Sequence, residues 1–188
     1  MLSWRELPGP ARAIGTALTR AVDAATAGDM QEYESAAAAL VALPPLPTGR
    51  VLAAVVRALL EDQHPDGLDG DDIRVVLGDC LRATLPWLGA DTVDVSVLIA
   101  VLASALGIHE AGVTYTDPNP ARIVSDDLPS EWDGTPAETT GRPPTPAEYA
   151  FHAPLLLADL LGRSAFGLSP YLDAAFTEIA RGEQMDMP

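Results

Sequence analysis

Apolar residues recur along most of the chain at spacings of three and four positions, which is typical of helices that bury one face. Proline and glycine residues interrupt this pattern where helices are expected to end. The pattern therefore predicts an all-α fold of about seven helices, packed as antiparallel hairpins or as an irregular bundle. The expected helices cover residues 11–27, 30–43, 49–63, 71–87, 91–106, 146–162 and 169–182.

Local sequence marks the start of several of these helices. Thr145, Pro146 and Glu148 combine an N-cap threonine, a proline at the first helical position and a glutamate at the third, which together form a capping box. Asp91 is expected to cap the helix that follows it. The second half of that helix is apolar nearly all round, so we expect residues 93–106 to form the central helix, surrounded by its neighbours.

Residues 107–145 break the helical pattern, because they are rich in proline, glycine and acidic residues. A connection of this length without a helix is unusual inside a compact domain. Residues 113–116 and 122–125 have the pattern of two short strands, which would pair as a β-hairpin. We therefore expect one all-α domain, residues 1–188, in four parts. These are a five-helix part (1–106), a long acidic insertion (107–145), a C-terminal helical pair (146–182) and a tail (183–188).

The length and the single cysteine indicate the class of protein. A chain of 188 residues buries enough surface to fold without a disulfide or a metal. The longest apolar run, residues 95–108, is too short to span a bilayer, and the N-terminus lacks the pattern of a signal peptide. Cys80 has no second cysteine to pair with, which fits a reducing compartment. We expect a soluble cytoplasmic protein, and the absence of lysine beside abundant alanine is typical of a high-GC bacterial genome.

The chain is strongly acidic, with 27 acidic and 11 basic residues and a net charge of −16. Acids and arginines balance within residues 1–60, so the whole excess lies in residues 61–188. Such a field repels nucleic acids and anionic membranes, so we expect neither as a partner. It favours a basic protein instead, through electrostatic steering. The neutral, alanine-rich residues 1–60 would serve packing or the formation of a homodimer.

The favoured hypothesis is a non-catalytic interaction or regulatory protein that captures a basic partner on its acidic surface. The sequence contains no phosphate-binding glycine loop and no dinucleotide-binding motif, and we expect no cofactor. The acidic run of residues 61–72 lacks the spacing of a calcium-binding EF-hand loop, and Asp71 or Asp72 is expected to cap the helix that begins there. The candidate partner-binding residues are Asp66, Asp69, Asp71, Asp126, Asp127, Glu131 and Trp132.

A divalent-metal-dependent hydrolase is an alternative function. Residues four apart on a helix are neighbours, so Glu148 and His152 could ligate one ion together. A competing interpretation assigns these two residues to a polar outer face with local ion pairs, which they share with Asp159 and Arg163. The candidate metal ligands are His109, Glu110, Glu148 and His152, with Asp159 in support.

A pocket for an apolar small molecule is the other alternative, placed among the fourth, fifth and sixth predicted helices. Leu98, Leu102 and Leu156 are candidates for its lining, although the same leucines would also fit an ordinary hydrophobic core. Cys80 lies on the apolar face of its helix and has no histidine near it in sequence. We therefore expect Cys80 to be a buried, unreactive thiol.

Overall fold

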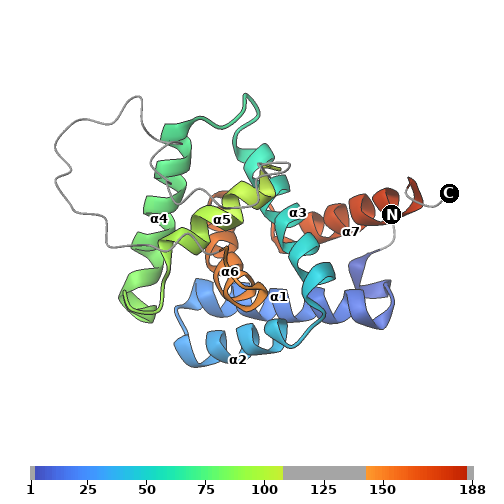
Figure 1. Cartoon of the computed structure of the whole chain (residues 1–188), viewed down its shortest axis with the longest axis horizontal. Helices are drawn as coiled ribbons and strands as arrows, with labels where there is room; N and C mark the ends of the chain where they lie inside the picture. The colour runs from blue at the N-terminus through green and yellow to red at the C-terminus, as the bar shows by residue number, and fades with distance from the viewer. Residues whose placement is uncertain (1–2, 108–142, 186–188) are drawn as a thin grey trace. The chain divides into compact units, whose positions relative to one another are not determined.

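The computed structural model describes residues 3–107 and 143–185. Within these residues it contains seven α-helices, one short 3₁₀ turn and no strand, which confirms the predicted all-α class for this part of the chain (Figure 1). The β-hairpin predicted within the insertion lies outside the described residues. None of the described helices is long and apolar enough to cross a membrane. The elements are η1 (Trp4–Glu6), α1 (Gly9–Ala27), α2 (Met30–Val41), α3 (Pro45–Gln63), α4 (Gly70–Leu88), α5 (Val95–Ala105), α6 (Pro146–Arg163) and α7 (Leu168–Met185).

Proline residues begin helices α1 and α3 earlier than the apolar spacing predicts. α1 begins at Gly9, with Pro10 in its first turn, and α3 begins at Pro45 rather than at Gly49. The prolines of residues 44–47 were expected to end the preceding helix, and the structure shows that they also open the next one. Proline is tolerated there because the first N–H groups of a helix have no intrahelical acceptor, so a missing N–H costs no hydrogen bond.

Capping residues begin α4 and α6. The predicted capping box of α6 is confirmed, because the Glu148 N–H donates to Thr145 Oγ1 (3.2 Å) and the Thr145 N–H donates to Glu148 Oε2 (2.6 Å). The expectation for α4 was wrong by a few residues, since Asp69 is the N-cap in place of Asp71 or Asp72. Asp72 completes a second capping box with Asp69, so the acids that follow the N-cap stabilise the same helix start.

Helix α5 begins at Val95 with Asp94 as its N-cap, and not at Asp91 as predicted. Asp94 Oδ1 accepts a hydrogen bond from the Ser96 N–H at 2.8 Å. The N–H of Asp94 itself donates to Nε2 of His152 on α6, at 2.9 Å. This tertiary hydrogen bond fixes the chain just before α5, which explains why the helix starts there rather than at the earlier aspartate.

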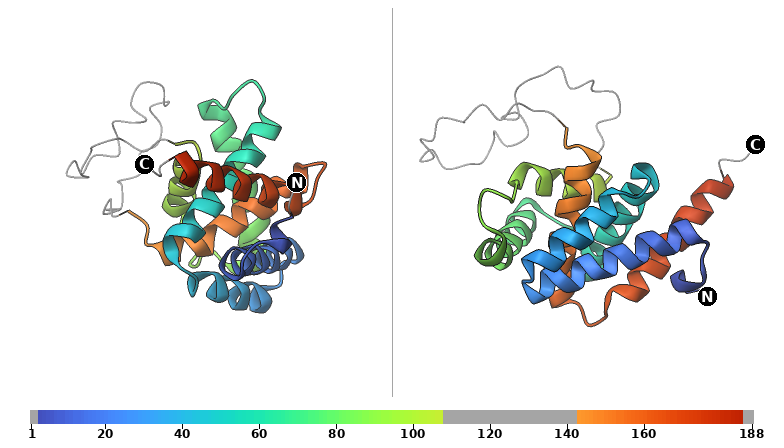
Figure 2. Two further views of the ribbon diagram at one scale, coloured as in Figure 1. Left: turned by 90° about the vertical axis from the view of Figure 1, so that its right-hand side faces the viewer. Right: turned by 90° about the horizontal axis from the view of Figure 1, so that it is seen from below.

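Helix α6 is the centre of the described residues, because it packs against α1, α2, α3, α4 and α5. Figure 1 shows α6 in the middle of these helices, and the views of Figure 2 agree. The expectation that residues 93–106 form the central helix was wrong. α5 packs mainly on α3 and α6, and it leaves Val95 41% and Ile99 49% exposed. α6 instead supplies fully or almost fully buried leucines to the core, which are Leu155, Leu156, Leu157 and Leu160.

A tyrosine of α2 donates a hydrogen bond to the main chain of α6, one residue after the carbonyl that Pro154 leaves without its helical donor. Pro154 is buried in the interior of α6 and has no N–H to donate to the carbonyl four residues before it. The hydroxyl of Tyr33 donates to the next carbonyl along the helix, that of Phe151. Tyr33 is fully buried and meets Phe151 and Trp87 edge to face, at ring-centroid distances of 5.3 and 5.4 Å. Burial raises the pKa of Tyr33 well above its ordinary value, so the phenol remains a donor at neutral pH.

The N-terminal turn η1 is tied to α7 and α1. The Trp4 N–H donates to Asp173 Oδ1 at 2.6 Å, and the Trp4 indole N–H donates to Ser169 Oγ at 3.1 Å. The Trp4 ring covers Gly15 of α1, where an added Cβ atom would lie 2.4 Å from the ring. Glycine at this position therefore permits the close approach that joins the first described helix to the last.

Candidate functional site

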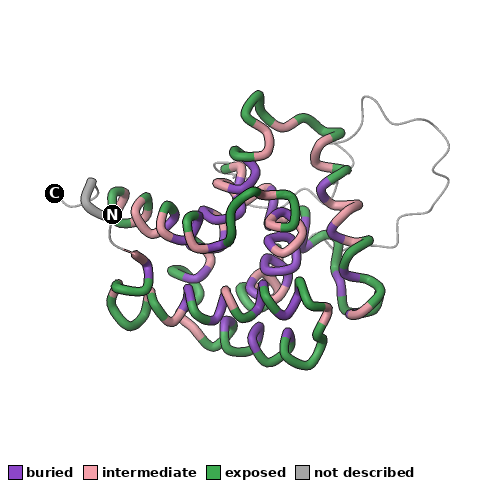
Figure 3. Tube along the Cα trace, turned by 180° about the vertical axis from the view of Figure 1, so that it is seen from behind, coloured by how far each residue is buried: buried purple, intermediate pink, exposed green. Residues whose placement is uncertain are grey.

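The predicted partner-binding surface includes the end of α3, the connection to α4 and the first turn of α4. We call residues 61–72 the acidic turn. Figure 3 shows the connection between the two helices as a mainly exposed part of the chain. The carboxylates of the acidic turn belong to Glu61, Asp62, Asp66, Asp69, Asp71 and Asp72.

Asp69 organises the acidic turn through backbone hydrogen bonds. Its Oδ1 accepts from the N–H groups of Asp71 (2.8 Å) and Asp72 (2.9 Å), while Asp72 Oδ2 accepts from the Asp69 N–H (3.1 Å). The hydrogen bonds from Asp72 and Asp71 lower the pKa of Asp69, because they stabilise its charged form. Asp69 therefore stays ionised at neutral pH while it caps α4.

Other acids of the turn differ in how far the protein neutralises them. Asp71 pairs with Arg74, one turn along α4. Asp62 accepts a hydrogen bond from the Tyr171 hydroxyl at 2.8 Å, which ties the end of α3 to α7. Asp66 is exposed and makes no hydrogen bond or ion pair with any residue that the structure describes. The acidic turn keeps an excess of negative charge because its carboxylates outnumber the arginines that reach them.

Some of the remaining predicted site residues lie within the part of the chain that the structure describes, and the others lie outside it. Glu148 and His152 of the candidate metal site are described. Among the described residues, no three histidine, cysteine or acidic side chains gather in a way that could hold a metal ion. The predicted residues His109, Glu110, Asp126, Asp127, Glu131 and Trp132 lie outside the described residues.

His152 is buried, with 5% of its surface exposed, so its assignment to a polar outer face was wrong. Its Nε2 lies 2.9 Å from the Asp94 backbone nitrogen, and its Nδ1 lies 2.8 Å from the Glu148 carbonyl oxygen. Because a backbone N–H only donates, Nε2 must accept, and the ring proton must lie on Nδ1, which donates to Glu148. Both ring nitrogens are thus engaged, and the neutral imidazole holds the start of α5 against α6.

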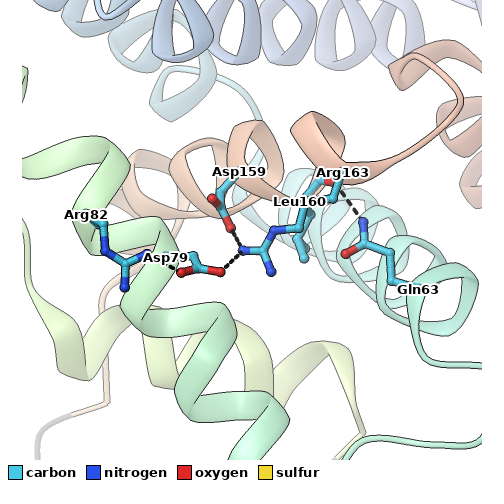
Figure 4. Close-up of polar contacts among 6 residues, drawn as sticks. All are labelled: Gln63, Asp79, Arg82, Asp159, Leu160 and Arg163. Atoms are coloured by element: carbon cyan, nitrogen blue, oxygen red, sulfur yellow. Dashed lines mark hydrogen bonds and ion pairs between the residues drawn. The ribbon is translucent and has the colours of Figure 1, made fainter.

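A polar network joins α4 to α6 (Figure 4). The sequence predicted local ion pairs on this stripe of α6, and Arg163 does pair with Asp159. The Arg163 guanidinium also lies 3.1 Å from Oδ2 of Asp79, which pairs in turn with Arg82 on α4. Burial raises the pKa of Asp159 and the charge of Arg163 opposes that shift. In the same view the Gln63 amide of α3 donates to a main-chain carbonyl of α6 at 2.7 Å.

Cys80 is fully buried on α4, as the sequence predicts. Burial, assisted by the negative charge of Asp159, raises the pKa of the thiol to about 12. The thiolate is the nucleophilic form of cysteine, and this pKa leaves almost none of it at neutral pH. Cys80 is therefore a packing residue of the interface between α4 and α6.

The structure contains a cleft that the sequence did not predict, where the ends of α2 and α5 meet the starts of α3 and α6. The cavity has a volume of about 500 Å³, which lies within the usual range of small-molecule sites. We call it the Thr48 cleft. Its lining is mostly apolar, and none of the described lining residues is charged. The lining includes Leu40, Leu43, Thr48, Leu52, Ser104 and Tyr149.

Two hydroxyl groups of the Thr48 cleft are buried without a partner. Neither Thr48 Oγ1 nor the Tyr149 hydroxyl makes a hydrogen bond with the described residues, and Thr48 is only 2% exposed. One signal in the sequence could have pointed to this site. Thr48 is a polar residue that lies four positions before Leu52, in line with the apolar face of α3. No local pattern in the sequence indicates that the ends of four helices meet at this cleft. The leucines predicted to line a pocket, Leu98, Leu102 and Leu156, are buried in the core, and none of them lines this cleft.

Comparisons of the chain with models of known protein families, with curated proteins and with solved structures find no match. A proposal for its function therefore has to rest on the side chains described above.

Proposed function

We propose that this protein is a non-catalytic interaction module that binds a basic protein partner at the acidic turn. The observation that carries this proposal is the concentration of carboxylates in residues 61–72, on an exposed connection between two helices. A field of this kind attracts a basic surface before contact and orients it during approach.

The local structure holds this charge in a fixed position. Asp69 and Asp72 cap α4 reciprocally, so the backbone of the turn is ordered by its own hydrogen bonds. The backbone hydrogen bonds that lower the pKa of Asp69 also hold its charged carboxylate at the start of α4. Asp66 lies beside this cap and is exposed to solvent. A preorganised charged surface loses less conformational entropy on binding, which supports an interaction role.

Two described side chains that could carry chemistry, Cys80 and His152, have structural roles instead. Cys80 is buried with its pKa raised to about 12, so it is protonated and inaccessible at neutral pH. His152 is buried with both ring nitrogens in hydrogen bonds. Each group is engaged in holding helices together.

A variant that removes charge while it keeps the cap tests the proposal. The turn variant combines Glu61→Gln, Asp66→Asn and Asp71→Asn and leaves Asp69 and Asp72 unchanged. Calorimetric titration with an oligoarginine peptide as a basic probe should show binding to the unmodified protein that weakens steeply with salt. The turn variant should bind about tenfold more weakly at low salt, since each lost exposed pair contributes roughly 0.5 kcal/mol.

A matched control separates the acidic turn from the net charge of the chain. Glu6→Gln, Asp23→Asn and Glu34→Gln remove the same charge from exposed positions of η1, α1 and α2. This control variant should lose less than about threefold in affinity, because the Debye length of about 10 Å at 0.1 M salt limits the reach of its charges. Equal losses in the two variants, or an affinity that does not change with salt, would contradict binding at the acidic turn.

A further inference from the structure

Thr48 differs from four other helical threonines of this protein in its hydrogen bonding. Thr16, Thr19, Thr26 and Thr177 each donate their hydroxyl proton to the carbonyl four residues earlier, at 2.7–2.8 Å. Thr48 does not, although the Pro44 carbonyl is one turn away and accepts the Thr48 N–H at 3.2 Å. Buried hydroxyls in folded proteins nearly always have a partner. The hydroxyl of Thr48 is therefore a buried polar group without a partner, on a residue that lines the cleft.

The Tyr149 hydroxyl lines the same cavity from α6. It is buried without a hydrogen bond to the described residues. Burial raises the pKa of this phenol, and the side chain of Ser104 lowers it in part. The Tyr149 and Ser104 hydroxyls do not reach hydrogen-bonding geometry. Tyr149 is therefore protonated at neutral pH and available as a donor. Two unpaired hydroxyl groups from different helices, α3 and α6, thus belong to residues that line the same mostly apolar cavity.

The charges around the cleft indicate what kind of polar group it would accept. The starts of α3 and α6 meet there, and helix starts carry partial positive charge. At the start of α6, however, the Glu148 carboxylate already accepts hydrogen bonds from the N–H and hydroxyl of Thr145, at 2.6 and 2.8 Å. This carboxylate disfavours a second anion. With no charged lining residue to pair with a cation either, an uncharged ligand fits best.

We infer that the Thr48 cleft binds an uncharged, mainly apolar molecule that carries one hydrogen-bonding oxygen, such as an alcohol or a ketone. The oxygen is held by Thr48 and Tyr149, and the apolar part lies against leucines of α2 and α3. The volume of about 500 Å³ accommodates a molecule of the usual size for such sites. This site is separate from the acidic turn, so its test does not depend on a basic partner.

A series of probes with one chain and three head groups tests the ligand class. 1-Octanol, octanoate and octylammonium share their alkyl chain and differ in charge. Titration of each into the full-length protein, followed by methyl NMR, should shift the signals of Leu40, Leu43 and Leu52. 1-Octanol should bind most tightly of the three. Tighter binding of octanoate or octylammonium would overturn the uncharged class, and unmoved cleft methyls with all three probes would overturn the site.

The contacts of Thr48 and Tyr149 with the ligand are tested by substitutions that remove each hydroxyl and keep the shape of the side chain. Thr48→Val and Tyr149→Phe should each weaken 1-octanol binding about fivefold, which is the loss expected for one neutral hydrogen bond. Neither should lower the midpoint of thermal unfolding, because the deleted hydroxyls have no partner in the protein. Thr19→Val removes a hydroxyl that bonds to the main chain of its own helix and does not line the cleft. This control should leave the affinity unchanged. Unchanged affinity in both cleft variants would overturn the assignment of Thr48 and Tyr149.

Discussion

Helices α5 and α6 show that the most apolar helix need not be the central one. α5 is apolar nearly all round, yet it leaves Val95 and Ile99 substantially exposed. α6 is the more polar helix, since it contains a histidine and an aspartate, and a proline interrupts its hydrogen bonding. Five helices nevertheless pack around it. The composition of the two helices would suggest the opposite arrangement.

The difference lies in how the polar groups of α6 are accommodated. His152 uses both ring nitrogens, one toward Asp94 and one toward Glu148. The Phe151 carbonyl of α6 accepts a hydrogen bond from the Tyr33 hydroxyl. Buried polar groups are tolerated when they are paired, so each of these partners allows α6 to occupy the centre. A central position therefore depends on satisfied polar atoms as well as on apolar surface.

Truncation of a leucine on each helix should give the largest contrast. Leu156→Ala removes a fully buried side chain from α6 and should lower the free energy of unfolding by about 3 kcal/mol, through lost burial and the cavity left behind. Ile99→Ala on α5 removes a side chain that is 49% exposed and should cost less than about 1 kcal/mol. Urea unfolding of both variants measures the two values. Equal losses would contradict the different burial of the two helices.

The hydrogen bond between the two helices should give the next largest effect. His152→Phe leaves the Asp94 N–H without its acceptor and should cost about 2 kcal/mol in the free energy of unfolding. Amide hydrogen exchange at Asp94 should accelerate as well. His152→Gln places an acceptor oxygen near the same N–H and should recover part of both effects. If His152→Phe is as stable as the original protein, the imidazole does not hold the start of α5.

A pH titration should give the smallest effect, at the buried interface of α4 and α6. The pKa of Cys80 is raised from 9.0 to about 12 in the folded protein, so the unfolded chain loses this proton first as pH rises. The contribution of the protonated thiol to stability is complete below pH 9 and is lost progressively toward pH 12. The expected loss at pH 10 is on the order of 1 kcal/mol.

Replacement of the thiol isolates this contribution from other groups. Cys80→Val removes the titrating proton and should flatten the decline in the free energy of unfolding between about pH 8 and pH 10. Tyr33, whose pKa is also raised, contributes at higher pH, so the comparison ends at pH 10. An identical decline in both proteins would show that Cys80 titrates normally in the fold.

The sequence predicted the features that a few neighbouring residues determine. The capping box of Thr145 and Glu148 lies within one turn, so its chemistry is visible without the fold. The apolar spacing likewise located all seven described helices, with errors at their ends. The start of α5 was misplaced because a hydrogen bond from Asp94 to a distant helix decides it. A local sequence pattern cannot predict a partner that lies so far along the chain.

The packing and the cleft were unpredictable for the same reason. Helix α6 is central because of the neighbours it meets, and these neighbours come from residues 9–105 and lie far from it in sequence. The Thr48 cleft brings together ends of four helices. Thr48 could be noticed as a polar residue among apolar ones, but nothing in its surroundings in sequence placed Tyr149 beside the same cavity.

The order of the helices along the chain affects how this protein can fold while it is being made. The ribosome completes α1 to α5 before it reaches α6, the helix that all five share as a neighbour. At synthesis rates of about 5–20 residues per second, the segment between residues 105 and 163 delays the arrival of complete α6 by roughly 3–12 seconds. During that interval the faces of α1 to α5 that pack against α6 in the folded protein have not yet met it. We therefore expect the newly made chain to be vulnerable to aggregation until its central helix emerges.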